Sequence, residues 1–330
     1  MSRRVGSPKA LVTAVTAALN SSASSRGEPD MVGILPTSVV EMPGPPPIRS
    51  GGRYRVEPPG VAVPGENPFS HAKTRVIAVA SGKGGVGKSS VTTNLAVALA
   101  RKGKDVAAID ADVWGFSMPR MLGVENGPEL NEDNQMIPPS AYGVRLLSMG
   151  FFVPEDQAVI WRGPMLHKAL EQFLTDVAWG EPDYLIIDMP PGTGDVSLSM
   201  SQFLPRAEVV IVTTPQPAAQ AVAQRAAAMA EKVELDVIGV VENMSWFRGD
   251  DGVSYEIFGA GGGQELADRL EVPLLGRIPL VPALRAGGDD GHPIVVADPE
   301  SEAAQCFVSV ADQIDAITPT RIYRSELKIL

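Results

Sequence analysis

Cysteine, histidine and long apolar runs are all scarce in this chain of 330 residues. The single cysteine, Cys306, excludes an intramolecular disulfide and is typical of a protein from a reducing compartment. No stretch approaches the roughly 20 apolar residues that a membrane-spanning helix needs. The three histidines, His71, His167 and His292, are scattered and indicate no metal site. These absences favour a cytoplasmic protein and make a membrane partner a poor fit.

Positive charge is also in short supply, because the formal net charge is −11. The imbalance is uneven along the chain. Residues 1–73 carry eight Lys and Arg against five Asp and Glu, whereas residues 74–330 carry 20 against 34, a net of −14. Broad nucleic-acid binding depends on neutralising phosphates with a basic surface. We therefore expect no such binding.

The first 72 residues have a composition of their own, with 11 of the 29 prolines and eight glycines. This composition predicts a largely extended segment over 1–72, followed by a folded domain over 73–318 and a tail over 319–330. Near the start, basic residues precede a ten-residue apolar run and so imitate a signal peptide. The run is short and rich in Ala and Thr, and we predict a short amphipathic helix there instead.

From Thr74 onward, short apolar runs alternate with helical patterns, which is typical of a parallel α/β sheet. The predicted fold class is therefore α/β, with a mostly parallel central sheet flanked by helices in three layers. The strands are predicted at 75–80, 105–109, 183–187, 208–213, 236–241 and 274–278. The helices are predicted near 88–102, 164–178, 217–232, 261–270 and 299–316.

Residues 81–90 read SGKGGVGKSS and contain the pattern G-x-x-x-x-G-K-[ST]. An apolar run precedes the pattern and a helix-compatible stretch follows it, and strand, glycine loop and helix form the setting that this motif needs. Glycines let backbone N–H groups turn toward phosphates, and the helix offers its positive end. We predict a P-loop that binds ATP. Its residues are Gly82, Lys83, Gly84, Gly85, Val86, Gly87, Lys88, Ser89 and Ser90.

Two lysines in this loop have different expected roles. Lys88 is expected to reach the β- and γ-phosphates, while the Ser89 hydroxyl completes the coordination shell of Mg²⁺. Lys83 follows the first glycine of the loop, which is an unusual place for a lysine. Its side chain need not fold back onto its own phosphates and can point across a dimer interface toward a partner's nucleotide.

Carboxylates follow two of the predicted strands. Asp188 ends the run YLIID and is expected to hold Mg²⁺, partly through water. Asp110 and Asp112 follow the strand at 105–109, where Asp112 would orient the attacking water and Asp110 would support the metal shell. A lone aspartate after a strand is usually a solvated cap. Two such sites beside a phosphate loop favour catalysis, which would rest on positioning and electrostatics.

Six segments of the chain carry a common pattern, namely SGKGGVGKSS, DADVWGFSMP, WRGPM, DMPPGTGD, VVENMSWF and EIFGAGGG. Together they resemble the Mrp/ApbC family of P-loop ATPases, which belongs to the deviant Walker A group with the MinD, ParA and nitrogenase iron protein families. The resemblance runs from about Phe69 to about Ile317 and implies a homodimer in which Lys83 reaches the partner's ATP. It also implies that Asn243 helps to recognise adenine, whereas the residues alone would make this asparagine a turn cap.

The same resemblance implies that the protein carries an iron–sulfur cluster and hands it to client apo-proteins. In the family, a C-x-x-C that holds the cluster ordinarily follows the ENMS segment, but residues 246–259 contain no cysteine here. Thiolates are the expected cluster ligands. Asp250 and Asp251 are poor substitutes and lie in an apparent hairpin turn, GDDG. Cys306 has the pattern of a core thiol, so we identify no cluster ligand.

Three functions remain open at this point. The first is an ATP-hydrolysing iron–sulfur cluster carrier, and the second is an ATP-switched scaffold or chaperone without a cluster. The third is a MinD/ParA-like positioning ATPase that acts on a membrane or DNA. The tail at 320–330 mixes basic and apolar residues as a short membrane-binding helix does. The ENMS and EIFGAGGG segments speak against this third function, because they belong to the Mrp pattern.

Overall fold

The computed structural model describes residues 67–70, 73–113, 115–153, 163–192 and 194–317. The predicted N-terminal amphipathic helix, nearly all of the Pro- and Gly-rich segment and the C-terminal tail lie outside these residues. The domain boundaries at both ends therefore stay predictions.

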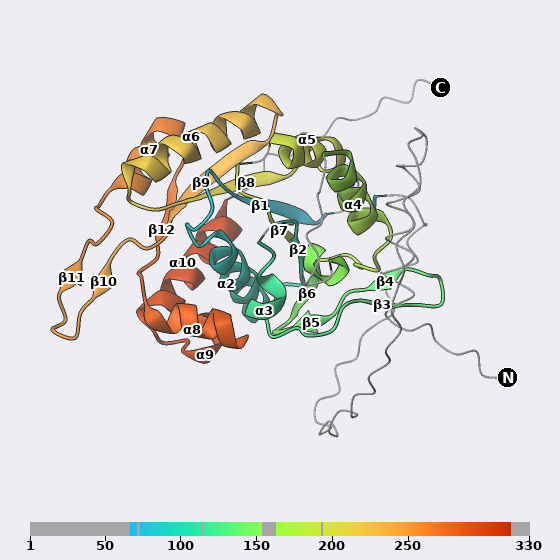
Figure 1. Cartoon of the computed structure of the whole chain (residues 1–330), viewed down its shortest axis with the longest axis horizontal. Coiled ribbons are helices and arrows are strands. Elements are labelled where there is room, and N and C mark those ends of the chain that lie inside the picture. Colours follow the sequence, from blue (N-terminus) through green and yellow to red (C-terminus); the bar gives the residue numbers. More distant parts are fainter. Residues whose placement is uncertain (1–66, 71–72, 114, 154–162, 193, 318–330) are drawn as a thin grey trace, which may run out of the picture. The chain divides into compact units, whose positions relative to one another are not determined.

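An eight-stranded sheet forms the centre of the described domain (Figure 1). All neighbouring strands are parallel except the edge strand β5, which pairs antiparallel with β6. The six predicted strands are all present, within two residues at each end. In spatial order the sheet consists of β12 (Leu274–Arg277), β9 (Asp236–Glu242), β8 (Glu208–Thr213), β1 (Arg75–Ser81), β7 (Tyr184–Asp188), β2 (Val106–Asp110), β6 (Val144–Ser148) and β5 (Ser140–Ala141).

Helices cover both faces of the sheet, and the alternation of side chains along each strand divides the core in two. In β1, for example, Val76 and Ala78 pack into one apolar cluster, and Ile77 and Val79 pack into the other. The first cluster is closed by α4 (Gly163–Thr175), α5 (Gly194–Phe203), α6 (Pro217–Lys232) and α7 (Gly262–Leu270). The second is closed by α2 (Lys88–Arg101), α3 (Met118–Met121), α8 (Pro282–Asp290), α9 (Ile294–Ala297) and α10 (Glu302–Ala316).

These layers confirm the predicted fold class, an α/β domain with a mostly parallel sheet between helices. Several elements were not predicted from the sequence, among them β6, α5 and the α8–α9 pair. Because β6 lies between β2 and β5, the sheet extends further on that side than the six predicted strands imply.

Short hairpins lie at the edges of the domain. The hairpin of β10 (Phe247–Arg248) and β11 (Ser254–Tyr255) extends away from the layers (Figure 1). Its turn is the predicted GDDG sequence, closed by a 2.9 Å hydrogen bond from the amide of Gly252 to the carbonyl oxygen of Gly249. A second hairpin joins β3 (Glu129–Leu130) and β4 (Met136–Ile137).

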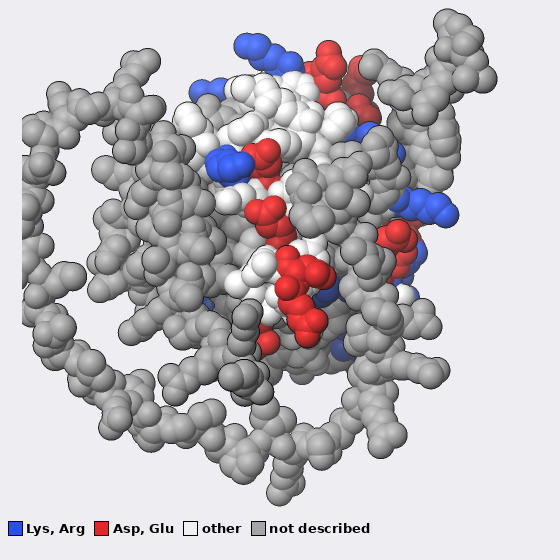
Figure 2. Space-filling view, turned by 90° about the vertical axis from the view of Figure 1, so that its right-hand side faces the viewer, with Lys and Arg blue, Asp and Glu red and all other residues white. Residues whose placement is uncertain are grey.

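The surface of the domain is acidic, as its net charge implies. Figure 2 shows Asp and Glu side chains following one another down the middle of one face, with basic side chains mainly toward the edges. The β3–β4 hairpin alone exposes Glu129, Glu132 and Asp133. Among the described residues, no helix is both long enough and apolar enough to span a membrane.

Candidate functional site

The carboxyl ends of the parallel strands meet at one edge of the sheet, which is where α/β folds bind ligands. The predicted phosphate loop lies at this edge, between β1 and α2. Gly85 has φ +80° and Gly87 has φ +77°, backbone conformations that disfavour any residue with a Cβ. Gly87 is also the residue from which α2 begins, and its carbonyl oxygen accepts the first helical hydrogen bond from Val91, at 3.0 Å.

Two glycines of the loop allow close approach to other parts of the chain. A Cβ on Gly82 would lie 2.2 Å from the backbone of Val222 in α6. A Cβ on Gly87 would lie 2.2 Å from the side-chain amide of Asn243, which follows β9. The loop is therefore fixed by α6 at its start and by the end of β9 at its close.

Lys88, at the start of α2, points into a buried group of polar side chains. Its Nζ lies 2.7 Å from Oδ2 of Asp188 and 3.4 Å from Oγ of Ser89. The Asp188 carboxylate also accepts hydrogen bonds from Ser89 Oγ and from Thr92 Oγ1, both at 2.6 Å. Asp188 is fully buried, so this pairing with a cation and two hydroxyls is what allows it to carry charge there.

Asp112 faces the same lysine from the loop after β2. Its Oδ2 lies 3.8 Å from Nζ of Lys88, and its Oδ1 accepts a hydrogen bond of 3.1 Å from the amide of Gly115. The side chain is largely buried, two residues past the end of β2, whose neighbour β7 ends in Asp188. The structure therefore places Lys88, Ser89, Asp112 and Asp188 close together beside the glycine loop.

Asp110 is also buried but turns to different partners. Its carboxylate accepts hydrogen bonds from the backbone amides of Asp112, Ser117 and Met118 and from the Ser148 hydroxyl, all between 3.1 and 3.2 Å. Complete burial, with the charge of Asp188 nearby, raises the pKa of Asp110 to about 7, although Lys88 acts in the opposite direction. The carboxylate therefore ties the start of α3 to β2 and β6.

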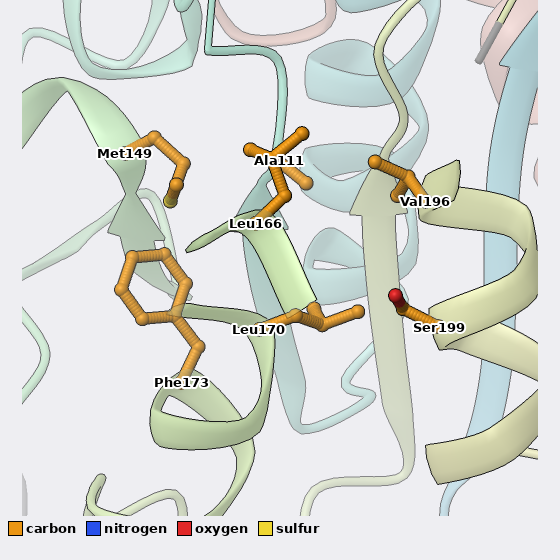
Figure 3. A pocket seen from close by; sticks show the side chains of 7 residues that line it. All are labelled: Ala111, Met149, Leu166, Leu170, Phe173, Val196 and Ser199. Atoms are coloured by element: carbon orange, nitrogen blue, oxygen red, sulfur yellow. The ribbon is translucent and has the colours of Figure 1, made fainter. Parts of the chain in front are cut away.

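The segment that carries these two aspartates is backed by apolar side chains. Ala111 borders a cavity of about 10 Å³, closed by residues of α4, α5 and the η2 turn (Met149–Phe152), as Figure 3 shows. A cavity of this size and apolar lining holds no ligand. The packing fixes the backbone between Asp110 and Asp112 from behind. The lining residues are Ala111, Met149, Leu166, Leu170, Phe173, Val196 and Ser199.

Asn243 lies against the phosphate loop. Its side-chain Nδ2 donates a 2.8 Å hydrogen bond to the carbonyl oxygen of Val86, and its backbone amide donates to Thr213. Its Oδ1 is buried and has no hydrogen-bond partner among the residues that the structure describes. An unpaired buried acceptor is costly, and this one is available for a donor such as an amino group.

The residue before it, Glu242, anchors this part of the site. Its fully buried carboxylate accepts hydrogen bonds from the amide of Gly263 at the start of α7, from Ser245 Oγ and from Arg277 Nε. Arg277 also lies over the ring of Trp246, 5.4 Å from its centroid. The ENMS turn is therefore held between β9, β12 and α7.

Lys83 points away from the buried group. Its Nζ donates to Oε1 of Gln216, which immediately precedes α6, at 3.3 Å. Its carbonyl oxygen accepts a hydrogen bond of 3.1 Å from the Ser81 hydroxyl. In the single chain, the side chain of Lys83 is thus directed toward the start of α6.

Thiols and groups of metal-binding side chains are scarce in the described part of the chain. Cys306 lies half-buried on α10 and packs against the core, and burial raises the pKa of its thiol. No three His, Cys, Asp or Glu side chains come together as a metal site among the described residues. Asp251, in the hairpin turn, bonds to its neighbours Val253 and Tyr255.

Several residues of this site were not singled out from the sequence. Thr92 follows Ser89 by three positions on α2, so the two hydroxyls share one helix face, and this spacing could have indicated its contact with Asp188. Ser148 ends the unpredicted strand β6. Glu242 and Gln216 stand next to motif residues, but nothing in the sequence alone shows where their side chains turn.

Comparison with known proteins agrees with this geometry. A family model described as ParA: NUBPL iron-transfer P-loop NTPase matches residues 72–315. An iron–sulfur cluster carrier protein of Mycobacterium tuberculosis is 50% identical over 253 residues, which are 74% of this chain and 66% of that protein. The chain thus spans about two thirds of the length of the first curated relatives that it matches.

Solved structures show the same likeness. A nucleotide-binding protein of Archaeoglobus fulgidus in complex with ADP is 36% identical, with a TM-score of 0.60, covering 71% of this chain and 91% of that one. The septum site-determining protein MinD of Pyrococcus horikoshii, complexed with Mg-ADP, is 27% identical, with a TM-score of 0.56. That alignment covers 74% of this chain and 96% of MinD.

Proposed function

Because the chain belongs to the ParA/NUBPL family of iron-transfer P-loop NTPases, we propose that it is an ATP-hydrolysing homodimer that carries iron–sulfur clusters to client apo-proteins. The observation that carries the ATPase part is the buried contact of Lys88 with Asp188, flanked by Asp112, directly beneath a glycine loop at the carboxyl edge of the sheet. Buried charges in this arrangement are typical of phosphoryl transfer sites.

In this proposal, residues 82–90 bind the phosphates through backbone amides, and Lys88 contacts the β- and γ-phosphates. Ser89 and Asp188 provide hard oxygen donors that suit Mg²⁺, the first directly and the second partly through water. When bound, Mg²⁺ would offset the charge of the phosphates. The unpaired Oδ1 of Asn243 would accept a hydrogen bond from the amino group of adenine, while its Nδ2 keeps its bond to Val86.

The two aspartates after β2 receive different tasks. Asp112 would orient the attacking water, because its carboxylate lies at the phosphate-binding space beside Lys88. For Asp110 the hydrogen bonds favour a revised role. Its oxygens accept hydrogen bonds from the backbone amide of Asp112, from the start of α3 and from Ser148, so we assign it to positioning Asp112 rather than to the metal shell.

The homodimer part of the proposal rests on Lys83. A single chain leaves this lysine outside its own phosphate-binding space, bonded to Gln216. Across a two-fold interface the same side chain would reach the nucleotide of the partner, as the family resemblance implies. Symmetric pairs of this kind are the commonest oligomers. A cytoplasmic location agrees with the single cysteine.

The cargo is the open half of the proposal. An iron–sulfur cluster would be the substrate that the protein carries, and residues 246–259, where the family's cysteines ordinarily lie, contain none. This absence favours a second candidate, an ATP-switched scaffold that binds a client protein and no cluster. In both candidates the β10–β11 hairpin extends from the nucleotide-binding edge, because it follows directly on β9 and Asn243.

Anaerobic reconstitution with iron and sulfide separates the two candidates. The full chain would be reconstituted with and without ATP and Mg²⁺, and unbound iron would then be removed. Visible absorbance and iron analysis would measure what stays bound. If the protein is a carrier, it should bind iron, show charge-transfer bands and transfer the cluster to an apo-ferredoxin. Wild-type protein that retains no iron in any nucleotide state would contradict the carrier and favour the scaffold. Cys306→Ser tests the only thiol.

A further inference from the structure

The contact between Lys83 and Gln216 has consequences for how a dimer would form. We infer that Gln216 is a positioning residue that holds the Lys83 side chain within its own subunit and so opposes ATP-dependent dimerisation. The inference rests on the homodimer proposed above. It adds a regulatory element to the same site, namely the competition between an intrasubunit and an intersubunit partner for one ammonium group.

The geometry fixes the two residues within reach of each other. Gly82 packs directly on the backbone of Val222, so the start of the phosphate loop cannot move far from α6 without breaking this contact. Gln216 stands as the residue before α6, followed by Pro217, which suits the first position of a helix. The bond from Lys83 Nζ to Gln216 Oε1 therefore joins two backbone segments that are already held side by side.

The side chain of Gln216 is free for this task. Its backbone carbonyl accepts from Ala219 and Gln220 at the start of α6, but its side chain makes no capping hydrogen bond to the helix. Both side chains are only partly buried. Beyond Lys83, Gly84 and Gly85 have no other part of the chain near the position of a Cβ, so the lysine has room to turn away from α6.

The chemistry of Gln216 explains why its hold on Lys83 is reversible. Among the described residues Lys83 forms no salt bridge, and its acceptor is a neutral amide oxygen. A carboxylate at this position would hold the ammonium group more tightly, and a residue without an acceptor would not hold it at all. This neutral acceptor can be replaced by the negatively charged phosphates of a nucleotide on a partner subunit.

Sedimentation velocity of the full chain, with Mg²⁺ and the slowly hydrolysed analogue ATPγS, tests the inference. Gln216→Ala is expected to tighten the dimer about three- to tenfold in Kd, because the monomer loses one charge-assisted hydrogen bond. Gln216→Glu is expected to weaken it by about tenfold or more, and added salt should narrow this difference as the new ion pair is screened. Gln224→Ala, within α6 itself, is the matched control, since the side chain of Gln224 accepts a hydrogen bond from Arg269 instead.

Nucleotide affinity is measured at protein concentrations below the dimer Kd, where Gln216→Ala and the wild type should bind equally well. Lys83→Ala separates the proposal that Lys83 supports the dimer from the proposal that Gln216 opposes it. If it abolishes the ATPγS dimer while both Gln216 variants dimerise like the wild type, the dimer stands and the hold is refuted. A weaker dimer in Gln216→Ala refutes the hold as well. If Lys83→Ala dimerises like the wild type, the role of Lys83 across the interface and the hold by Gln216 are both refuted.

Discussion

The ammonium group of Lys88 lies 2.7 Å from the carboxylate of Asp188, and both side chains are buried. Each charge is tolerated in the interior because the other is present. A bound triphosphate would enter this pairing as a second anion, so the lysine would exchange one partner for another without leaving its position. Nucleotide binding and the buried ion pair are therefore linked.

Lys88→Ala should weaken ATP binding strongly. The variant loses a charged contact worth about 1.5–3 kcal/mol, or roughly 10- to 150-fold in affinity, and leaves Asp188 without its cation. Isothermal titration with ATP and Mg²⁺ would measure the loss, and circular dichroism would verify the fold. Lys104→Ala is the control, because Lys104 pairs with Asp315 at a partly exposed site. Near-normal ATP affinity in Lys88→Ala would exclude this loop as the nucleotide site.

Asp112→Ala should spare nucleotide binding and slow hydrolysis. Its carboxylate is 3.8 Å from Lys88 and is not part of the glycine loop, so ATP affinity should change little. Turnover should fall by about two to three orders of magnitude, as when a residue that acts on the reacting group is lost. Phosphate release at saturating ATP would show it. Asp112→Asn keeps the acceptor for Gly115 and should be equally slow. Retained turnover in both variants contradicts the assignment.

Asn243→Ala should weaken ATP binding by about tenfold, because it removes both the bond to Val86 and the acceptor proposed for adenine. The two contributions are distinguished by competition between ATP and GTP. If Oδ1 accepts from the adenine amino group, the preference for ATP over GTP should shrink together with the affinity. An unchanged preference would leave Asn243 with only its structural bond to the loop.

Stability should depend on pH through Asp110. Burial raises its pKa to about 7 in the folded protein, above the value of about 4 in an unfolded chain. Between these values the folded state binds the extra proton, so the free energy of unfolding falls as pH rises, by up to about 1.4 kcal/mol per pH unit. Urea unfolding of the nucleotide-free protein at pH 5 and pH 8 would measure it. Asp110→Asn should flatten the slope, and equal slopes in both proteins would contradict the burial argument.

Much of the fold followed from the sequence, because a parallel sheet buried on both faces requires apolar strands, and these are easy to recognise. The strand β6 did not follow. Its five residues, VRLLS, carry an arginine and follow a turn, so they lack the continuous apolar run of the other central strands. The helix α5 was also not predicted, because serines at several of its positions weaken the apolar pattern of a helix.

The site shows a similar division. The glycine loop, Lys88 and Asp188 could be located because their spacing and their positions after strands determine where they lie. The direction of a side chain is a different matter, since it depends on tertiary partners. Asp110 and Asp112 are two residues apart, yet one turns toward α3 and the other toward Lys88. Gln216 reaches Lys83 across 133 positions of sequence, and no local pattern reveals such a contact.

Mixing two inactive variants tests the central claim most directly, namely that each ATP site is completed by the Lys83 of a partner. Lys83→Ala and Asp112→Ala should each be nearly inactive alone. In a mixed dimer, the Asp112→Ala subunit donates its Lys83 to a site that still has Asp112. At protein concentrations well above the Kd of the mixed dimer, where subunits pair at random, an equal mixture should therefore recover about one quarter of the wild-type rate, since half of the dimers contain one complete site. A mixture no more active than the sum of its separate components would contradict the account.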